Sequence, residues 1–289
     1  MPSLRSRLLV AVLRATKRKA PYLDLRLMHE RIREERRTVD ATPPKGLGFD
    51  ERFVAGVRVS TVGPPRGAPK MRLLYLHGGC YVFEIAPQHH RFCASLANKL
   101  DATVSIPIYP LAPEYDALAI QAKVRAVIDA LGPFDAWVGD SAGAGMALAL
   151  AQSHPSPPPL LLLSPWLDIG LENPAIGPLE ERDPWLSRVG LRECGKLYAN
   201  ELDARDPRVS PIHGSIENIP RISMFIGTRD ILLPDARKLR DRAPEKIALF
   251  EYPEMVHDFM LIRGLPEGRQ ATRDIVEALS GRRAASGKE

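Results

Sequence analysis

Short, almost wholly apolar runs that alternate with helical segments constrain the fold of this chain more than any other feature. Residues 71–77 ("MRLLYLH") and 160–166 ("LLLLSPW") lack the polar–apolar alternation of a half-exposed strand. Such runs are typical of parallel strands whose two faces are both covered. The alternation predicts an α/β fold with a mainly parallel central sheet flanked by helices. We expect strands over residues 53–62, 71–77, 102–109, 134–141, 160–166, 221–228 and 247–253, and helices over 89–100, 117–131, 142–154, 237–242 and 269–279.

The composition is that of an ordinary globular protein, with 45% hydrophobic and 26% charged residues in a chain of 289. The net charge of +5 lies largely in the first 40 residues, which carry eleven Lys and Arg against five Asp and Glu. The rest is close to neutral and has no basic, aromatic-rich stripe, so we expect no nucleic-acid partner. Cys80, Cys93 and Cys194 lack the spacing of a zinc site or a disulfide framework, which favours a reducing, cytoplasmic location.

The N-terminal segment has helical periodicity, because Leu4, Leu8 and Val12 recur at intervals of four. Its apolar run is too short, and too soon followed by Arg14, to be a signal peptide or a transmembrane segment. Pro21 is expected to end this helix, and a second helix is expected over residues 23–37. The pattern fits either a helix on a membrane surface or a helix that packs on its own domain. We favour packing, since most amphipathic helices bury their apolar stripe in this way.

The strongest chemical signal is the pentad Gly139–Gly143 ("GDSAG"), which lies between an expected strand and an expected helix. It matches the G-x-S-x-G nucleophile elbow, in which a strained turn exposes the serine hydroxyl and the glycines let neighbouring backbone approach. Ser141 is therefore the candidate nucleophile. The simpler alternative is a plain strand-to-helix turn in which Ser141 is only the N-cap.

A serine hydroxyl needs a base, and in this kind of site the acid and then the histidine follow the serine along the chain. Asp230 comes directly after an expected strand, and His257 follows the last one. The carboxyl ends of parallel strands gather at one edge of a sheet, where we expect Ser141, Asp230 and His257 to meet. Asp235 is the competing acid, but it falls within an expected helix. His89 begins a helix, so it is not assigned as the base.

Backbone N–H groups are expected to hold the negative charge that develops on an ester carbonyl oxygen during attack. Residues 77–80 ("HGGC") follow an apolar strand, and their paired glycines let the backbone approach a ligand closely. One donor of such an oxyanion hole belongs to the residue after the nucleophile, here Ala142, and others belong to an HGGG-type loop. Gly78, Gly79 and Cys80 are therefore the candidate donors on this loop.

Taken together, these boxes resemble the bacterial hormone-sensitive-lipase-like branch of the α/β-hydrolase esterases. The resemblance runs from about residue 53 to 279 and includes "LHGGCY", "YPLAPE", "GDSAG", "LLLSPWLD", "DPRVSP", "GTRDILLPD" and "YPEMVHDF". It implies an α/β-hydrolase fold in which the N–H groups of Gly79 and Cys80 point into the oxyanion hole beside that of Ala142. It also implies a helical cap, built from residues 1–50 and an insertion at about 167–220, over a catalytic domain of residues 51–289.

Three residues depart from the pattern of that family. Cys80 replaces the third glycine, Pro110 replaces the usual arginine of the "YPLAPE" box, and Asp258 stands where glycine commonly follows the histidine. Cys80 retains its N–H, so we expect no effect on the oxyanion hole provided that residue 80 has a negative φ. Pro110 bears on the shape of its loop, and Asp258 is expected to shift the basicity of His257 slightly.

The chain is thus expected to be a serine carboxylic-ester hydrolase for short- to medium-chain acyl esters, with no metal and no organic cofactor. A lactone hydrolase with the same triad is a close alternative, because a cyclic ester presents the same carbonyl group. A non-catalytic ligand-binding protein of the same fold is the alternative from another class. The expected partner is a small-molecule ester or lactone. We expect no integral membrane segment, and the sequence is compatible with a weak membrane-surface contact and with a homodimer.

Overall fold

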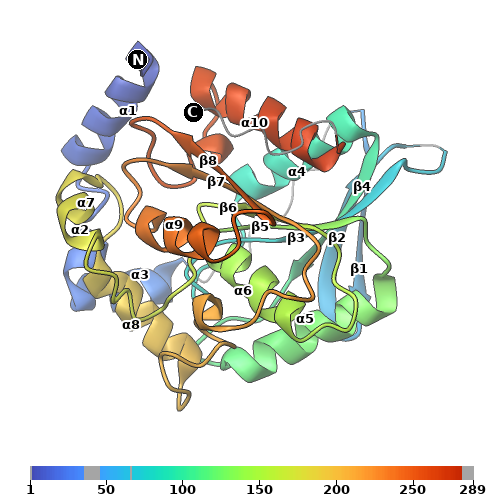
Figure 1. The fold of residues 1–289 in the computed structure, drawn as a ribbon, viewed down its shortest axis with the longest axis horizontal. Coiled ribbons are helices and arrows are strands. Elements are labelled where there is room, and N and C mark those ends of the chain that lie inside the picture. Colours follow the sequence, from blue (N-terminus) through green and yellow to red (C-terminus); the bar gives the residue numbers. More distant parts are fainter. Residues whose placement is uncertain (1, 36–45, 66, 282–289) are drawn as a thin grey trace.

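The computed structural model describes residues 2–35, 46–65 and 67–281, and it is built around an eight-stranded sheet (Figure 1). The strand order is β1-β2-β4-β3-β5-β6-β7-β8. β1 and β4 each pair with β2 in the antiparallel sense, and every other neighbouring pair is parallel. The expected α/β class with a mainly parallel sheet is therefore confirmed. The strands are β1 (Gly48–Val54), β2 (Val57–Gly63), β3 (Met71–Leu76), β4 (Ala102–Ile108), β5 (Ala136–Asp140), β6 (Leu160–Leu163), β7 (Ile222–Gly227) and β8 (Ile247–Tyr252).

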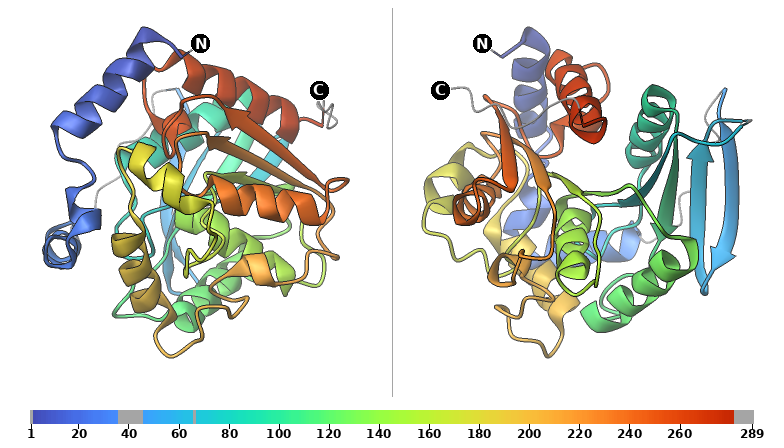
Figure 2. Two further views of the ribbon diagram at one scale, coloured as in Figure 1. Left: turned by 60° about the vertical axis from the view of Figure 1, so that its left-hand side comes forward. Right: turned by 45° about the vertical axis from the view of Figure 1, so that its right-hand side comes forward.

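Helices cover both faces of this sheet (Figure 2). One face packs on α4 (Pro87–Leu100) and α10 (Pro266–Leu279), and the other packs on α5 (Ala117–Leu131), α6 (Ser141–Gln152) and α9 (Leu233–Arg242). Because both faces are covered, the central strands β3, β5, β6 and β7 are buried along most or all of their length. This burial explains their continuous apolar sequences.

Parallel pairing places the carboxyl ends of the central strands at one edge. Leu76 at the end of β3 is in register with Gly139 in β5, and Asp140 at the end of β5 is in register with Leu163 in β6. Gly227 at the end of β7 is in register with Tyr252 at the end of β8. The loops that carry the candidate site residues therefore leave the sheet from the same edge.

The expected single strand over residues 53–62 is wrong, because the chain reverses at Ala55 and Gly56 to make the β1–β2 hairpin. Both turn residues have positive φ, 50° and 76°. A two-residue turn of this hand matches the twist of the flanking strands. Gly56 adopts this conformation readily, whereas Ala55 gives no sequence signal for it. β1 consequently begins at Gly48, earlier than the expected strand.

The N-terminal helices also differ in detail from the expectation. α1 (Leu4–Ala15) ends well before Pro21, which instead lies in the first turn of the short helix α2 (Ala20–Leu23), where its missing N–H costs nothing. α3 (Leu25–Glu34) begins at the N-cap Asp24, whose carboxylate accepts a hydrogen bond from the N–H of Arg26. The expected second helix reached residue 37, and residues 36 and 37 lie outside the described ranges.

α1 packs one face on the α/β body of the protein and leaves another exposed. Leu13 is buried in the core, and the N–H of Ser3 donates to Glu267 at the start of α10 at 2.6 Å. Leu4, Leu8 and Val12 are exposed on the opposite side. Among the helices within the described ranges, none has both the length and the apolar character required to cross a bilayer.

The segment between β6 and β7 lies against the N-terminal helices. It contains α7 (Ile176–Arg182), α8 (Arg188–Ala199) and the 3-10 turn η1 (Pro211–His213). A Cβ atom on Gly190 of α8 would come within 2.6 Å of the Tyr22 Cα atom in α2. The two segments are thus in close contact although they are far apart in sequence, and both lie on one side of the sheet (Figure 2).

Candidate active site

Ser141 lies at the junction between β5 and α6. Its φ is 51°, a left-handed conformation that is unusual for a residue other than glycine. The N-cap of α6 is Asp140, so the alternative in which Ser141 only caps the helix is wrong. Gly143 is required by close packing, since a Cβ atom there would lie 2.1 Å from the carbonyl oxygen of Leu76. The turn therefore has the strain and the close backbone approach of a nucleophile elbow.

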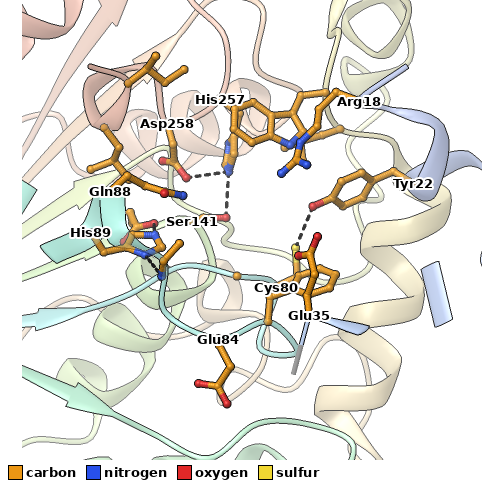
Figure 3. Close-up of a pocket in the computed structure, with 18 of the residues that line it drawn as sticks. Arg18, Tyr22, Glu35, Cys80, Glu84, Gln88, His89, Ser141, His257 and Asp258 are labelled. Atoms are coloured by element: carbon orange, nitrogen blue, oxygen red, sulfur yellow. Dashed lines mark hydrogen bonds and ion pairs between the residues drawn. The ribbon is translucent and has the colours of Figure 1, made fainter. Parts of the chain in front are cut away.

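The structure brings Ser141, His257 and Asp230 together in one chain of hydrogen bonds, of which Figure 3 shows the contact between His257 and Ser141. The Nε2 atom of His257 lies 3.0 Å from the Oγ atom of Ser141, and its Nδ1 atom lies 2.8 Å from the Oδ2 atom of Asp230. The other carboxylate oxygen of Asp230 accepts the N–H of Leu232 at 3.0 Å. All three side chains are buried. This geometry is that of a serine, a base and a carboxylate that orients the base.

Asp235, the competing acid, does not contact His257. It lies in the first turn of α9, where its Oδ1 atom accepts a hydrogen bond from Asn173 at 2.9 Å. Burial raises its pKa to about 6. The geometry therefore favours Asp230 as the acid.

A second carboxylate contacts the histidine at the nitrogen that faces the serine. The Oδ2 atom of Asp258 lies 3.1 Å from the Nε2 atom of His257 (Figure 3). Burial acts to lower the pKa of His257, but Asp258 and Asp230 outweigh it and hold this pKa well above its ordinary value. Burial raises the pKa of Asp258 itself to about 6, against the opposing effect of the His257 charge. Asp258 is expected from the sequence to shift the basicity of His257 only slightly. In the structure it forms a direct ion pair with His257.

The loop after β3 approaches the elbow closely. A Cβ atom on Gly78 would lie 2.3 Å from the Oδ2 atom of Asp140 and 3.0 Å from the Cβ atom of Ser141. The carbonyl of Gly79, whose φ is 123°, accepts two hydrogen bonds that fold the loop into a tight turn. Neither Gly79 nor Cys80 donates its N–H to another described residue. Ala142 is in the first turn of α6, where N–H groups have no partner within the helix.

The expectation that Cys80 has a negative φ is wrong, because its φ is 55°. This conformation costs a residue with a Cβ atom about 1–2 kcal/mol relative to its usual one. The cysteine is nevertheless accommodated: its side chain is buried, and its Sγ atom lies 3.7 Å from the hydroxyl of Tyr22. Cys80 thus joins the loop to the N-terminal helix α2.

Two buried histidines support the elbow, and sequence analysis assigned a role to neither. His89 in α4 forms an ion pair with Asp140 at 3.2 Å, and Tyr75 donates to the same carboxylate at 2.6 Å. His77 stacks on Tyr109 with ring centroids 4.2 Å apart, and burial is the main cause that lowers the pKa of His77 to about 3. His77 belongs to the "HGGC" motif, but no motif marks His89, since its contact with Asp140 joins residues distant in the chain.

Ser141 and His257 open into a cavity of about 370 Å³. Trp185 forms part of its wall and contacts the ring of His257 edge-on, with centroids 6.2 Å apart. Within the described ranges, no group of three or more His, Cys, Asp and Glu side chains is arranged to hold a metal ion. The cavity is bounded by the elbow, the loop at Gly79–Cys80, the N-terminal helices and the segment around residues 257–263.

A family model for the alpha/beta hydrolase fold matches residues 73–261, well over half of the chain. LipR of Mycobacterium tuberculosis is 32% identical over 294 residues, which cover 96% of this chain and 95% of LipR. An acetyl-hydrolase of Streptomyces hygroscopicus is 31% identical over 220 residues, 69% of this chain and 72% of its own. The crystal structure of an esterase from the bacterial hormone-sensitive lipase family superposes with a TM-score of 0.82 at 25% identity, covering 98% of this chain and 99% of the esterase.

The chain therefore belongs to the α/β-hydrolase family, in its bacterial hormone-sensitive-lipase-like branch. Within that family it is a carboxylic-ester hydrolase. The alternative of a non-catalytic ligand-binding protein is not supported.

Proposed function

We propose that the enzyme hydrolyses esters through an acyl-enzyme on Ser141, with His257 as the base and Asp230 as the acid that orients it. The observation that carries this proposal is the unbroken chain of hydrogen bonds from Asp230 through His257 to Ser141, at the wall of a cavity. In the first step the Oγ atom of Ser141 bonds to the ester carbonyl carbon as its proton passes to Nε2 of His257. That proton then goes to the departing alcohol, and water releases the acid by the same route.

In this proposal the oxyanion is held by backbone N–H groups. Those of Gly79, Cys80 and Ala142 lie on the two turns that meet beside Ser141, and the N–H of Gly78 is a further candidate on the same loop. Such donors act because they are already oriented toward the developing charge, at no further cost when the reaction occurs.

The proposed substrates are esters of short- to medium-chain acids. A cavity of about 370 Å³ that is lined by Ser141 and His257 supports a small acyl group. The name of the Streptomyces relative, an acetyl-hydrolase, agrees with this size. The cap would consist of α1–α3 and the segment at about 167–220, since both supply residues to the cavity. A cytoplasmic location and a homodimer stay predictions from the sequence.

The experiment that tests the proposed triad compares matched variants on 4-nitrophenyl butyrate. Ser141→Ala should lower kcat by at least about 1,000-fold, and Asp230→Asn should lower it by a factor on the order of 1,000–10,000. Asp235→Asn is the matched control, because it removes a buried carboxylate that does not contact His257. If Asp235→Asn were the more damaging of the two acid changes, the assignment of Asp230 would be wrong. A panel of lactones run beside the esters separates the two substrate classes.

A further inference from the structure

Two arginines from the N-terminal helices line the cavity that contains Ser141 and His257. Arg18 follows α1, and its guanidinium carbon lies 5.3 Å from the centre of the Trp185 ring (Figure 3). Arg31 belongs to α3, and its guanidinium carbon lies 4.5 Å from the centre of the Phe83 ring. Both cations thus rest on aromatic rings of the cavity wall, an arrangement that restricts where a guanidinium lies.

Both guanidinium groups have unused hydrogen-bond donors. Arg31 donates from Nε and Nη2 to the carboxylate of Glu35 at 2.9 and 3.0 Å, but its Nη1 is buried and has no partner. Only 13% of the Arg31 side chain is exposed, so water reaches it poorly. The backbone N–H of Arg18 donates to the carbonyl of Leu13, but its guanidinium makes no hydrogen bond to another described residue and lies over the Trp185 ring. Buried polar groups are nearly always paired, so the buried Nη1 of Arg31 calls for an acceptor. The half-buried guanidinium of Arg18 offers further donors to the same acceptor.

The charges around this part of the cavity leave room for an anion. Glu35 is already engaged by Arg31, and the carboxylate of Glu84 points away from the space between Arg18 and Tyr22 (Figure 3). The two arginines also repel each other: burial and the charge of Arg31 both lower the pKa of Arg18. A negatively charged group between them would relieve this repulsion and use the free donors.

We propose that the Arg18 and Arg31 side chains bind a carboxylate group carried by the substrate, so that the preferred substrates are anionic esters. This inference rests on the proposed function, since it names the substrate class of the same cavity. The carboxylate reaches the arginines either from the acyl part or from the alcohol part of the ester. In both cases the two guanidinium groups bind the same carboxylate group.

The test compares two matched pairs of esters by pH-stat. The acyl pair is monomethyl succinate and methyl succinamate, and the alcohol pair is 4-acetoxybenzoate and 4-acetoxybenzamide. Within each pair a neutral amide replaces a carboxylate of nearly the same shape, so the ratio of the two kcat/KM values isolates the charge. For the wild type we expect a ratio of about 10 or more in favour of the carboxylate in at least one pair.

Variants of the arginines and of Glu35 test whether these side chains cause the preference for the carboxylate ester. Arg18→Gln and Arg31→Gln should each lower it by about tenfold, chiefly through KM, because each removes a charged donor. Glu35→Gln should raise it, because it removes the anion that competes for Arg31. Arg26→Gln is the matched control: Arg26 is on the same helix as Arg31, and its side chain is 79% exposed, so the ratio should not change.

A wild-type ratio at or below one in both pairs would overturn the inference, as would an unchanged ratio in Arg18→Gln. If Arg31→Gln does not fold, Arg18→Gln decides alone, since the Arg18 side chain makes no hydrogen bond to another described residue and its backbone bond to Leu13 survives the change. The proposed function is judged separately, by whether the neutral amide esters are hydrolysed by the wild type and not by Ser141→Ala.

Discussion

At the scale of single residues, the contact between Asp258 and His257 distinguishes this site from a simple triad. The carboxylate lies 3.1 Å from the same nitrogen that, in the proposed mechanism, accepts the proton of Ser141. Two carboxylates around one imidazole favour its protonated form, in which it cannot act as a base. Because Asp258 and His257 interact strongly, their titration belongs to the pair.

We therefore expect Asp258→Asn and Asp258→Gly to move the acidic limb of the pH–rate profile to lower pH. The pKa of His257 is raised in part by Asp258, so removing that charge lowers it, and the neutral base persists to more acidic conditions. Glycine also fits the backbone, since φ at residue 258 is 47°. The pH dependence of kcat/KM measures this limb in the free enzyme. Asp241→Asn, an exposed change, should leave it in place, and an unmoved limb in both Asp258 variants would contradict the account.

Cys80 provides a second prediction at this scale. Cys80→Gly and Cys80→Ala should retain kcat within about fivefold of the wild type, because both keep the N–H that we assign to the oxyanion hole. Cys80→Pro should lower kcat by at least about 100-fold, since proline has no N–H and cannot adopt a φ of 55°. Steady-state kinetics on folded variants, checked by circular dichroism, measure this. A loss of several hundredfold in Cys80→Ala would mean that the thiol itself takes part.

At the scale of elements, the site depends on how closely α6 approaches the end of β3. The carbonyl oxygens of Leu76 and His77 lie so close to Gly143 that no side chain fits there. The helix N-terminus that presents Ala142 and the loop that presents Gly79 are thus fixed relative to each other by direct backbone contact.

Gly143→Ala should consequently destabilise the protein by about 2 kcal/mol or more and lower kcat as well, because the added methyl group forces α6 away from β3. Gly177→Ala in α7 is the control: its Cβ atom would meet no atom within 4 Å, and alanine favours a helix. Urea unfolding measures both. Equal stabilities of the two variants would show that the contact at Gly143 is not as tight as described.

At the scale of the whole molecule, the sequence predicted the α/β class, and the three residues it proposed as a triad lie in contact in the structure. These features have local signatures, because buried strands are apolar throughout and an elbow needs glycines around its serine. The turn at Ala55, the contact of Asp258 with His257 and the packing of Trp185 on the same ring have none. They arise where segments distant in sequence meet, and residue type alone does not specify such contacts.

The exposed face of α1 gives a prediction at this scale. Leu4 and Leu8 are 81% and 64% exposed, and α1 carries Arg5, Arg7 and Arg14 with no Asp or Glu. We expect weak, salt-sensitive binding to vesicles that contain anionic lipid, because apolar and basic groups lie together on one helix. Leu4→Ser/Leu8→Ser should reduce co-sedimentation by about half or more without altering hydrolysis of a soluble ester. Equal sedimentation of this variant and the wild type would remove any role for this face.

The central claim is that Ser141 forms a covalent intermediate activated by His257, and labelling with a fluorophosphonate tests it most directly. Intact mass and peptide mapping should show one adduct per chain, located on Ser141. The adduct should be absent in Ser141→Ala and should form at least about 100-fold more slowly in His257→Ala. An adduct on another residue such as Cys80, or labelling of Ser141 at an unchanged rate in His257→Ala, would contradict the account.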